Sequence, residues 1–245
     1  SPPSPPSPPP LSLAEEIQRR FRLGRPSDRL ADAGVLVHVW DASTSDAAWE
    51  VPIESCHMSA SLVNRYSPFL WPVGTGGLVL SLELDERQIE CSYAGDGRTQ
   101  GIAHGGCRME ERQCSRDNDG QWRNGRFDEC AWPPSQLGSM LRRQLERDER
   151  TFNEVILNSI VWQRLLPRLV VGVFYVAADD WAADDRDYRG ADGNHAAEEA
   201  AAEAQARRVR AAFLARFPGE DVPLLRYSRN LTDGGERTGG FEAWS

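Results

Sequence analysis

The longest uninterrupted apolar run of the chain, residues 169–178, constrains the fold more than any other feature. Pro167 stands just before this run and Asp179 ends it. A helix that crosses a membrane needs about 20 apolar residues, which is much more than this run offers. A strand that is buried on both faces has this length and is rich in Val, Phe and Tyr. We therefore expect a buried strand inside a globular domain and no membrane span.

Strand-like and helix-like segments share the remainder of the chain. We predict strands at residues 34–41, 57–64, 76–84, 152–158, 168–176 and 221–228, and helices at 12–24, 133–150, 159–167 and 195–217. Residues 88–97 are expected to lead into the cysteine-rich segment. The first helix begins with a capping box, in which Ser12 and Glu15 satisfy each other's backbone N–H groups. Strands dominate the first half and helices are interleaved later, which predicts an α+β fold. We expect one domain over residues 11–230, made of mostly short strands with three main helices.

The first ten residues, SPPSPPSPPP, cannot form a helix or a sheet, because proline lacks an N–H group and fixes φ. They are expected to form an extended polyproline II stalk. This segment resembles the Ser-Pro-Pro tracts of hydroxyproline-rich extracellular glycoproteins of green algae and plants. The resemblance implies hydroxylated, O-glycosylated prolines and a secreted or cell-wall location. The sequon at Asn230 agrees with it. Without a signal peptide, we expect the C-terminal part of a longer precursor, ending in a polar tail at residues 231–245.

Cysteines gather in one part of the sequence. Four of the five, Cys91, Cys107, Cys114 and Cys130, fall in or near a polar segment at residues 95–134 that lacks core periodicity. In an oxidising compartment this pattern predicts a disulfide-stapled insertion. Zinc is the weaker alternative, because no C-x2-C pair exists.

The charge balance excludes one class of partner. The formal net charge is −9, whereas proteins that bind nucleic acid present a basic surface to the phosphates. The acidic segment 177–194 does not have EF-hand spacing, because a loop that starts at Asp185 has Ala196 in its twelfth place instead of Glu. We expect this segment to be a solvated loop, and we assign no metal site.

One carboxylate stands out from its surroundings. Glu154 lies at the head of the apolar strand FNEVILN, directly after Asn153. Such an acid is either solvated at the edge of a sheet or carried into a cleft as a functional group. Burying it without a partner would cost several kcal/mol.

The strand with its Asn-Glu pair, the short helix and the apolar strand that follow resemble the closing segment of the ADP-ribosyltransferases. In chain order, His38 on an early strand and Ser59 and Ser61 in MSASLV match two further motifs of that family. The resemblance implies that His38, Ser59 and Ser61 bind NAD and that Glu154 is the catalytic carboxylate, which stabilises positive charge on the ribose. The arginine-modifying branch has Glu or Gln at the place of Phe152, so arginine is not the expected acceptor.

Tryptophans support a second interpretation. Trp71, Trp122 and Trp132 fall in predicted loops near Asp, Asn and Arg, and such a combination suits sugar binding by stacking and hydrogen bonding. The leading interpretation of the sequence is thus an extracellular or cell-wall interaction module on a glycosylated stalk, with glycans or matrix as partners. An ADP-ribosyltransferase-like enzyme that uses NAD is the alternative. The sequence leaves open whether the domain is an enzyme, and it names no cofactor beyond this alternative.

Overall fold

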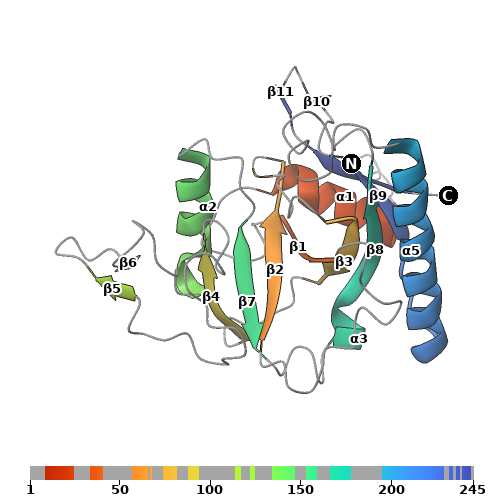
Figure 1. Ribbon diagram of the computed structural model, residues 1–245, viewed down its shortest axis with the longest axis horizontal. Coiled ribbons are helices and arrows are strands. Elements are labelled where there is room, and N and C mark those ends of the chain that lie inside the picture. The colour runs from red at the N-terminus through yellow and green to blue at the C-terminus, as the bar shows by residue number, and fades with distance from the viewer. Residues whose placement is uncertain are drawn as a thin grey trace, which may run out of the picture.

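The computed structural model describes the chain in segments. These are residues 9–24, 34–40, 57–65, 67, 74–81, 88–93, 114–116, 122–124, 134–146, 153–158, 166–177, 195–228, 232–233, 236–237 and 239–243. The helices are α1 (Leu13–Leu23), α2 (Leu137–Glu146), α3 (Leu166–Leu169) and α5 (His195–Arg216), and a 3-10 turn at Pro134–Gln136 leads into α2. The predicted α+β fold is confirmed (Figure 1).

The centre of the molecule is a mixed sheet of eight strands in the order β12-β9-β8-β3-β1-β2-β7-β4. Its strands are β1 (Val35–Trp40), β2 (His57–Val63), β3 (Gly76–Leu80), β4 (Ile89–Tyr93), β7 (Glu154–Asn158), β8 (Val170–Val176), β9 (Leu224–Ser228) and β12 (Gly240–Ala243). Neighbouring strands are antiparallel except β8 and β9, which are parallel. Two short hairpins lie outside this sheet, β5 (Cys114–Arg116) with β6 (Trp122–Asn124) and β10 (Thr232–Asp233) with β11 (Glu236–Arg237).

Helices cover both faces of the sheet. On one face, α2 contributes Met140 and Leu141, and α5 contributes Val209 and Phe213, to a large apolar core. On the other face, α1 packs against β1, β3, β8, β9 and β12 in a second core. Ile17 and Phe21 are the buried residues of α1, and they share one side of the helix because they are four residues apart. The predicted capping box at the start of α1 is present.

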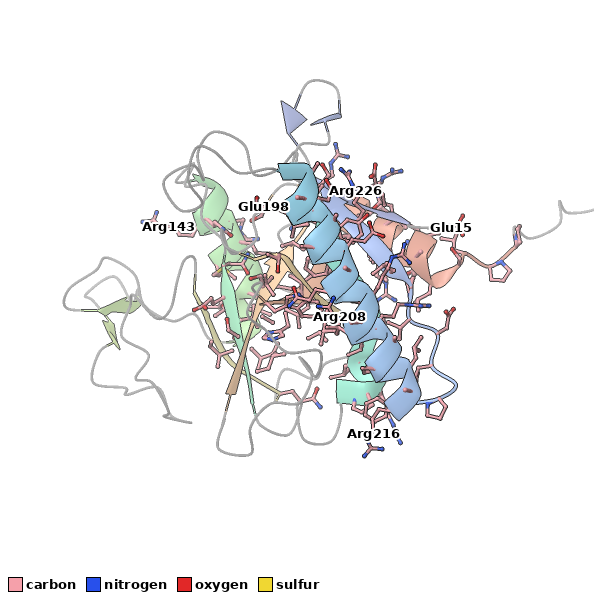
Figure 2. All side chains as sticks on the ribbon, turned by 45° about the vertical axis from the view of Figure 1, so that its right-hand side comes forward. Glu15, Arg143, Glu198, Arg208, Arg216 and Arg226 are labelled. Carbon is pink, nitrogen blue, oxygen red and sulfur yellow. The ribbon has the colours of Figure 1, made fainter. Side chains whose placement is uncertain are left out.

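Ion pairs connect the longest helix, α5, to the strands β9 and β12. Arg226 of β9 lies near the first turns of α5, where Glu198 is labelled (Figure 2). Its guanidinium donates to Glu199 of α5 at 2.9 Å and to Glu242 of β12 at 3.3 Å. The ion pairs therefore tie α5, β9 and β12 together at one end of the sheet.

Most strands and helices lie where the sequence places them, and the differences occur at the ends of elements. The predicted strand 168–176 begins at Val170, because α3 takes up Leu166–Leu169. The polar tail predicted for residues 231–245 needs correction, since residues 240–243 form β12 and pair with β9. Phe241 is 1 % exposed and packs against the rings of Phe21, Phe174 and Tyr227. The sheet thus extends beyond residue 230.

No helix in the described ranges is long and apolar enough to cross a membrane. Of the predicted stalk, only Pro9 and Pro10 are described, and both are exposed. Residues 1–8 lie outside the described part of the chain.

Candidate functional site

The strand β2 changes its partner halfway along its length. Its second half pairs with β1, with Val63 opposite Val35 and Ser61 opposite Val37. Its first half pairs with β7, from His57 to Ala60. β1 and β7 therefore both stop pairing with β2 near its middle. Figure 1 shows β2 between these two strands. The predicted site residues His38, Ser59 and Glu154 lie near this point.

Ser59 and Glu154 meet across β2 and β7. The Ser59 hydroxyl donates a hydrogen bond to Glu154 Oε1, with 2.8 Å between the two oxygens. Both side chains are half-buried. Hydrogen bonds to a charged oxygen are shorter and stronger than neutral ones. This bond holds the plane and the position of the carboxylate at the first residue of β7.

The register of the strands shows which face carries this pair. Ser59 stands opposite Ile156, and Glu154 precedes Ile156 by two residues, so all three side chains leave the sheet on the same side. Val63 shares that side, because it lies four residues after Ser59, and it packs in the core formed with α1. The Ser59–Glu154 pair therefore lies on the α1 side of the sheet.

His38 is linked to the pair through the backbone of Ser59. Its Nδ1 lies 2.8 Å from the Ser59 carbonyl oxygen. A carbonyl can only accept, so Nδ1 carries the proton, and Nε2 of the neutral ring carries a lone pair. The imidazole has some contact with solvent, but protein surrounds most of it, and this loss of hydration lowers the pKa of His38. His38 is therefore neutral at pH 7.

The strand register places the ring of His38 on the other face of the sheet. His38 stands opposite Leu78 of β3 and alternates in phase with Leu36 and Trp40. Leu36, Trp40 and Leu78 belong to the core under α5. Ser59, Glu154 and His38 are thus connected in a chain of hydrogen bonds, with the Ser59 backbone between the two faces.

Asn153 binds the backbone of β2 from the β7 side, as His38 does from the β1 side. Its amide oxygen accepts from Leu62 N at 2.8 Å, and its amide nitrogen donates to Leu62 O at 2.6 Å. The register of β2 and β7 would bring the backbones of these two residues opposite each other, two residues beyond the last pair, Ala60 and Val155. The side chain of Asn153 therefore replaces a pair of backbone hydrogen bonds.

Further buried polar side chains surround Asn153. Ser61 donates to the Asn153 carbonyl at 2.8 Å, and Asn153 Nδ2 also donates to Gln144 Oε1 of α2 at 3.2 Å. Gln144 Oε1 accepts a second bond, from Ser67 at 3.0 Å, and the Ser67 backbone N–H donates to the side chain of Asn64. All five side chains are buried. We call Asn64, Ser61, Ser67, Gln144 and Asn153 the buried amide network.

Asn153 and Gln144 were not among the predicted site residues. One signal for Gln144 was present, since it follows Met140 by four residues and therefore falls on the buried face of α2. A polar residue on an apolar helix face requires a partner. Asn153 offered only its position beside Glu154. Its partner Leu62 is 91 residues away in the chain, and no local pattern reveals such a contact.

Several predicted site residues lie outside the described part of the structure. These are Trp71, Trp132, Cys107, Cys130 and Asn230. For Trp122, Cys91 and Cys114 only the backbone is described, within β6, β4 and β5. The sugar-binding surface, the disulfides and the glycosylation site therefore stay predictions.

Among the described residues, no group of three or more His, Cys, Asp or Glu side chains could hold a metal ion. A comparison of the chain with models of protein families finds no match. A comparison with curated proteins likewise finds none. The geometry around β2 is therefore the basis for a functional proposal.

Proposed function

We propose that the domain is an ADP-ribosyltransferase-like enzyme that uses NAD as its substrate, with Glu154 as the catalytic carboxylate. The observation that carries this proposal is the hydrogen bond from Ser59 to Glu154. A solvated edge carboxylate would be free to rotate, whereas this one is half-buried and fixed by a partner on the neighbouring strand. Electrostatic catalysis depends on groups that are oriented before the reaction begins.

The proposed reaction breaks the bond between the ribose anomeric carbon and the nicotinamide nitrogen. The bonding electron pair leaves with the nicotinamide, which becomes neutral, and positive charge develops on the ribose. The carboxylate of Glu154 stabilises that charge. A water molecule or an acceptor hydroxyl then forms the new bond to the anomeric carbon, and Glu154 takes its proton. Ser59 keeps one carboxylate oxygen in place throughout.

Two neighbouring groups support the pair in this proposal. His38 holds the backbone of Ser59 from the β1 side, through the bond to its carbonyl oxygen. The resemblance implies in addition that His38 binds NAD, but its ring lies on the face of the sheet opposite Ser59 and Glu154, so in our proposal His38 acts on the site only through the Ser59 backbone. Ser61, which the resemblance also assigns to NAD binding, is 5 % exposed and donates to the Asn153 carbonyl. In our proposal Ser61 supports the strand that carries Glu154.

The test is nicotinamide release from NAD by the purified domain. The wild type should release nicotinamide, and Glu154→Gln should retain the fold and lose activity. Glu203→Gln is a matched control, because Glu203 is a carboxylate on the distant helix α5 and forms an ion pair with Arg207 of the same helix. That variant should be as active as the wild type.

We also propose, from the Ser-Pro-Pro segment and the Asn230 sequon, that the domain is displayed outside the cell on a glycosylated stalk. Mass spectrometry of the protein from its native source tests this location, since hydroxyproline in the first ten residues is the expected modification. Unmodified proline there, together with an unglycosylated Asn230, would contradict it.

A further inference from the structure

The polar groups behind Glu154 form a more extensive arrangement than the catalytic proposal requires. β7 begins at Glu154, so strand pairing holds the residues that follow Glu154 but not the residue that precedes it. The residue on its other side is Asn153, which is 0 % exposed and bonded through both its side chain and its carbonyl group. The position of Glu154 depends on how firmly that residue is held.

Each hydrogen-bonding atom of the Asn153 amide has a specific partner. Both N–H groups are used, one by Leu62 O and one by Gln144 Oε1, and the amide oxygen accepts from Leu62 N. Aspartate has the same shape but no donor, so it would set a carboxylate oxygen against two acceptors. Alanine would leave Leu62 N and O buried without partners, and buried unsatisfied groups destabilise a fold. The arrangement is therefore specific for an amide at position 153.

We propose that Asn153 is a positioning residue for Glu154, and that Ser61 assists it by binding the Asn153 carbonyl. By replacing a backbone pair between β2 and β7, the Asn153 amide fixes the register at which β7 begins. A slip of one residue would turn every side chain of the strand to the other face. Glu154 would then leave the side of the sheet that carries Ser59. The catalytic meaning of this role rests on the proposed function, but the structural role does not.

The network offers a matched pair of variants. Ser61 and Ser67 are both buried serines whose hydroxyl donates one bond, to the Asn153 carbonyl and to Gln144 Oε1 respectively. Ser61→Ala and Ser67→Ala thus remove the same atom from two places in one network. Only the first acts directly on Asn153. A merely structural role of the network would make the two variants equivalent.

The first readout is the coupling between Ser59 and Glu154. It is obtained from the unfolding free energies of the wild type, Ser59→Ala, Glu154→Ala and the double variant, because alanine removes the acceptor of the bond. The same cycle is then measured in the backgrounds Ser61→Ala, Asn153→Ala and Ser67→Ala. We expect the coupling to fall by more than half in the first two backgrounds and to persist in the third. This measurement needs no enzymatic activity, so it is decided separately from the proposed function.

The second readout is the kinetics of nicotinamide release. Ser61→Ala should lower kcat about 10-fold and leave KM for NAD within about twofold, because a misplaced carboxylate harms the transition state more than binding. Ser67→Ala should change neither value. If Asn153→Ala does not fold, Ser61→Ala decides the matter. Three results would each overturn the proposal. The coupling could survive in the Ser61→Ala background, it could be lost equally in the Ser67→Ala background, or the wild type could show no Ser59–Glu154 coupling at all.

Discussion

The hydroxyl of Ser59 lies 2.8 Å from the carboxylate of Glu154 on the neighbouring strand, although the two residues are 95 apart in sequence. They meet where β2 passes from one partner strand to the next. At that point His38 binds the β2 backbone from one side and Asn153 binds it from the other. Side chains therefore complete the hydrogen bonding of β2 on both sides of the pair.

Ser59→Ala tests the contribution of this bond. Removing the hydroxyl leaves the charge of Glu154 in place but frees the carboxylate to rotate. A hydrogen bond to a charged group contributes about 1.5–3 kcal/mol, so we expect nicotinamide release to fall by about 10- to 100-fold. Steady-state assays with NAD measure this, and circular dichroism should show an unchanged fold. Full activity in the variant would mean that Ser59 does not orient the catalytic group.

His38 predicts a specific dependence of stability on pH. The pKa of His38 is lowered in the folded protein, because burial opposes the charged ring. The unfolded chain then binds more protons just below the ordinary value of 6.5, so the free energy of unfolding decreases as pH falls through that region. Protonation also places a charge beside the core, although Nδ1–H keeps its bond to Ser59.

Urea unfolding at pH 7 and pH 5 measures this effect in the wild type and in His38→Asn. Asparagine does not titrate, so the variant should lose less stability between the two pH values than the wild type does. Equal losses in the two proteins would show that His38 is not the group responsible.

Phe241→Ala tests the placement of the C-terminal strand. This ring is buried among Phe21, Phe174 and Tyr227, and removing a buried phenylalanine costs about 3–5 kcal/mol. Glu242→Ala is the control on the same strand, because Glu242 is exposed and its pair with Arg226 should contribute less than about 1 kcal/mol. Denaturant unfolding gives both values. A polar tail without a strand would tolerate either change equally.

The cysteines give a prediction that is independent of the sheet. Cys91, Cys107, Cys114 and Cys130 gather near a polar segment, and we expect at least one disulfide among them. Free-thiol titration of unfolded, unreduced protein from an oxidising expression system should therefore find fewer than five thiols. Five reactive thiols would exclude any disulfide in the chain.

The sequence predicts the elements of this fold better than their assembly. Apolar runs locate β1, β3 and β8, and periodicity with a capping box locates α1. The sequence did not predict β12, because the segment Gly240–Ala243 is short and Phe241 is its one large apolar residue. Its burial depends on aromatic partners that come from three other parts of the chain.

The candidate site divides in the same way. His38, Ser59 and Glu154 can be selected from the sequence by residue type and by resemblance, and the structure joins them by hydrogen bonds. The opposite orientation of His38 follows only from the pairing of β1 with β3, which the sequence does not state. The role of the Asn153 side chain depends on the exact end of the β2–β7 pairing, and element boundaries are the least predictable feature of a sequence.

The most direct test of the account is nicotinamide release from NAD by the wild type and by Glu154→Gln at equal concentrations of folded protein. Glutamine retains the shape of the side chain and removes its charge, so NAD binding and stability should change little. The loss of one preorganised electrostatic group predicts a turnover lower by about 100-fold or more. No NAD turnover and no NAD binding by the wild type would contradict the enzymatic account, and an equally active Glu154→Gln would remove Glu154 from the mechanism.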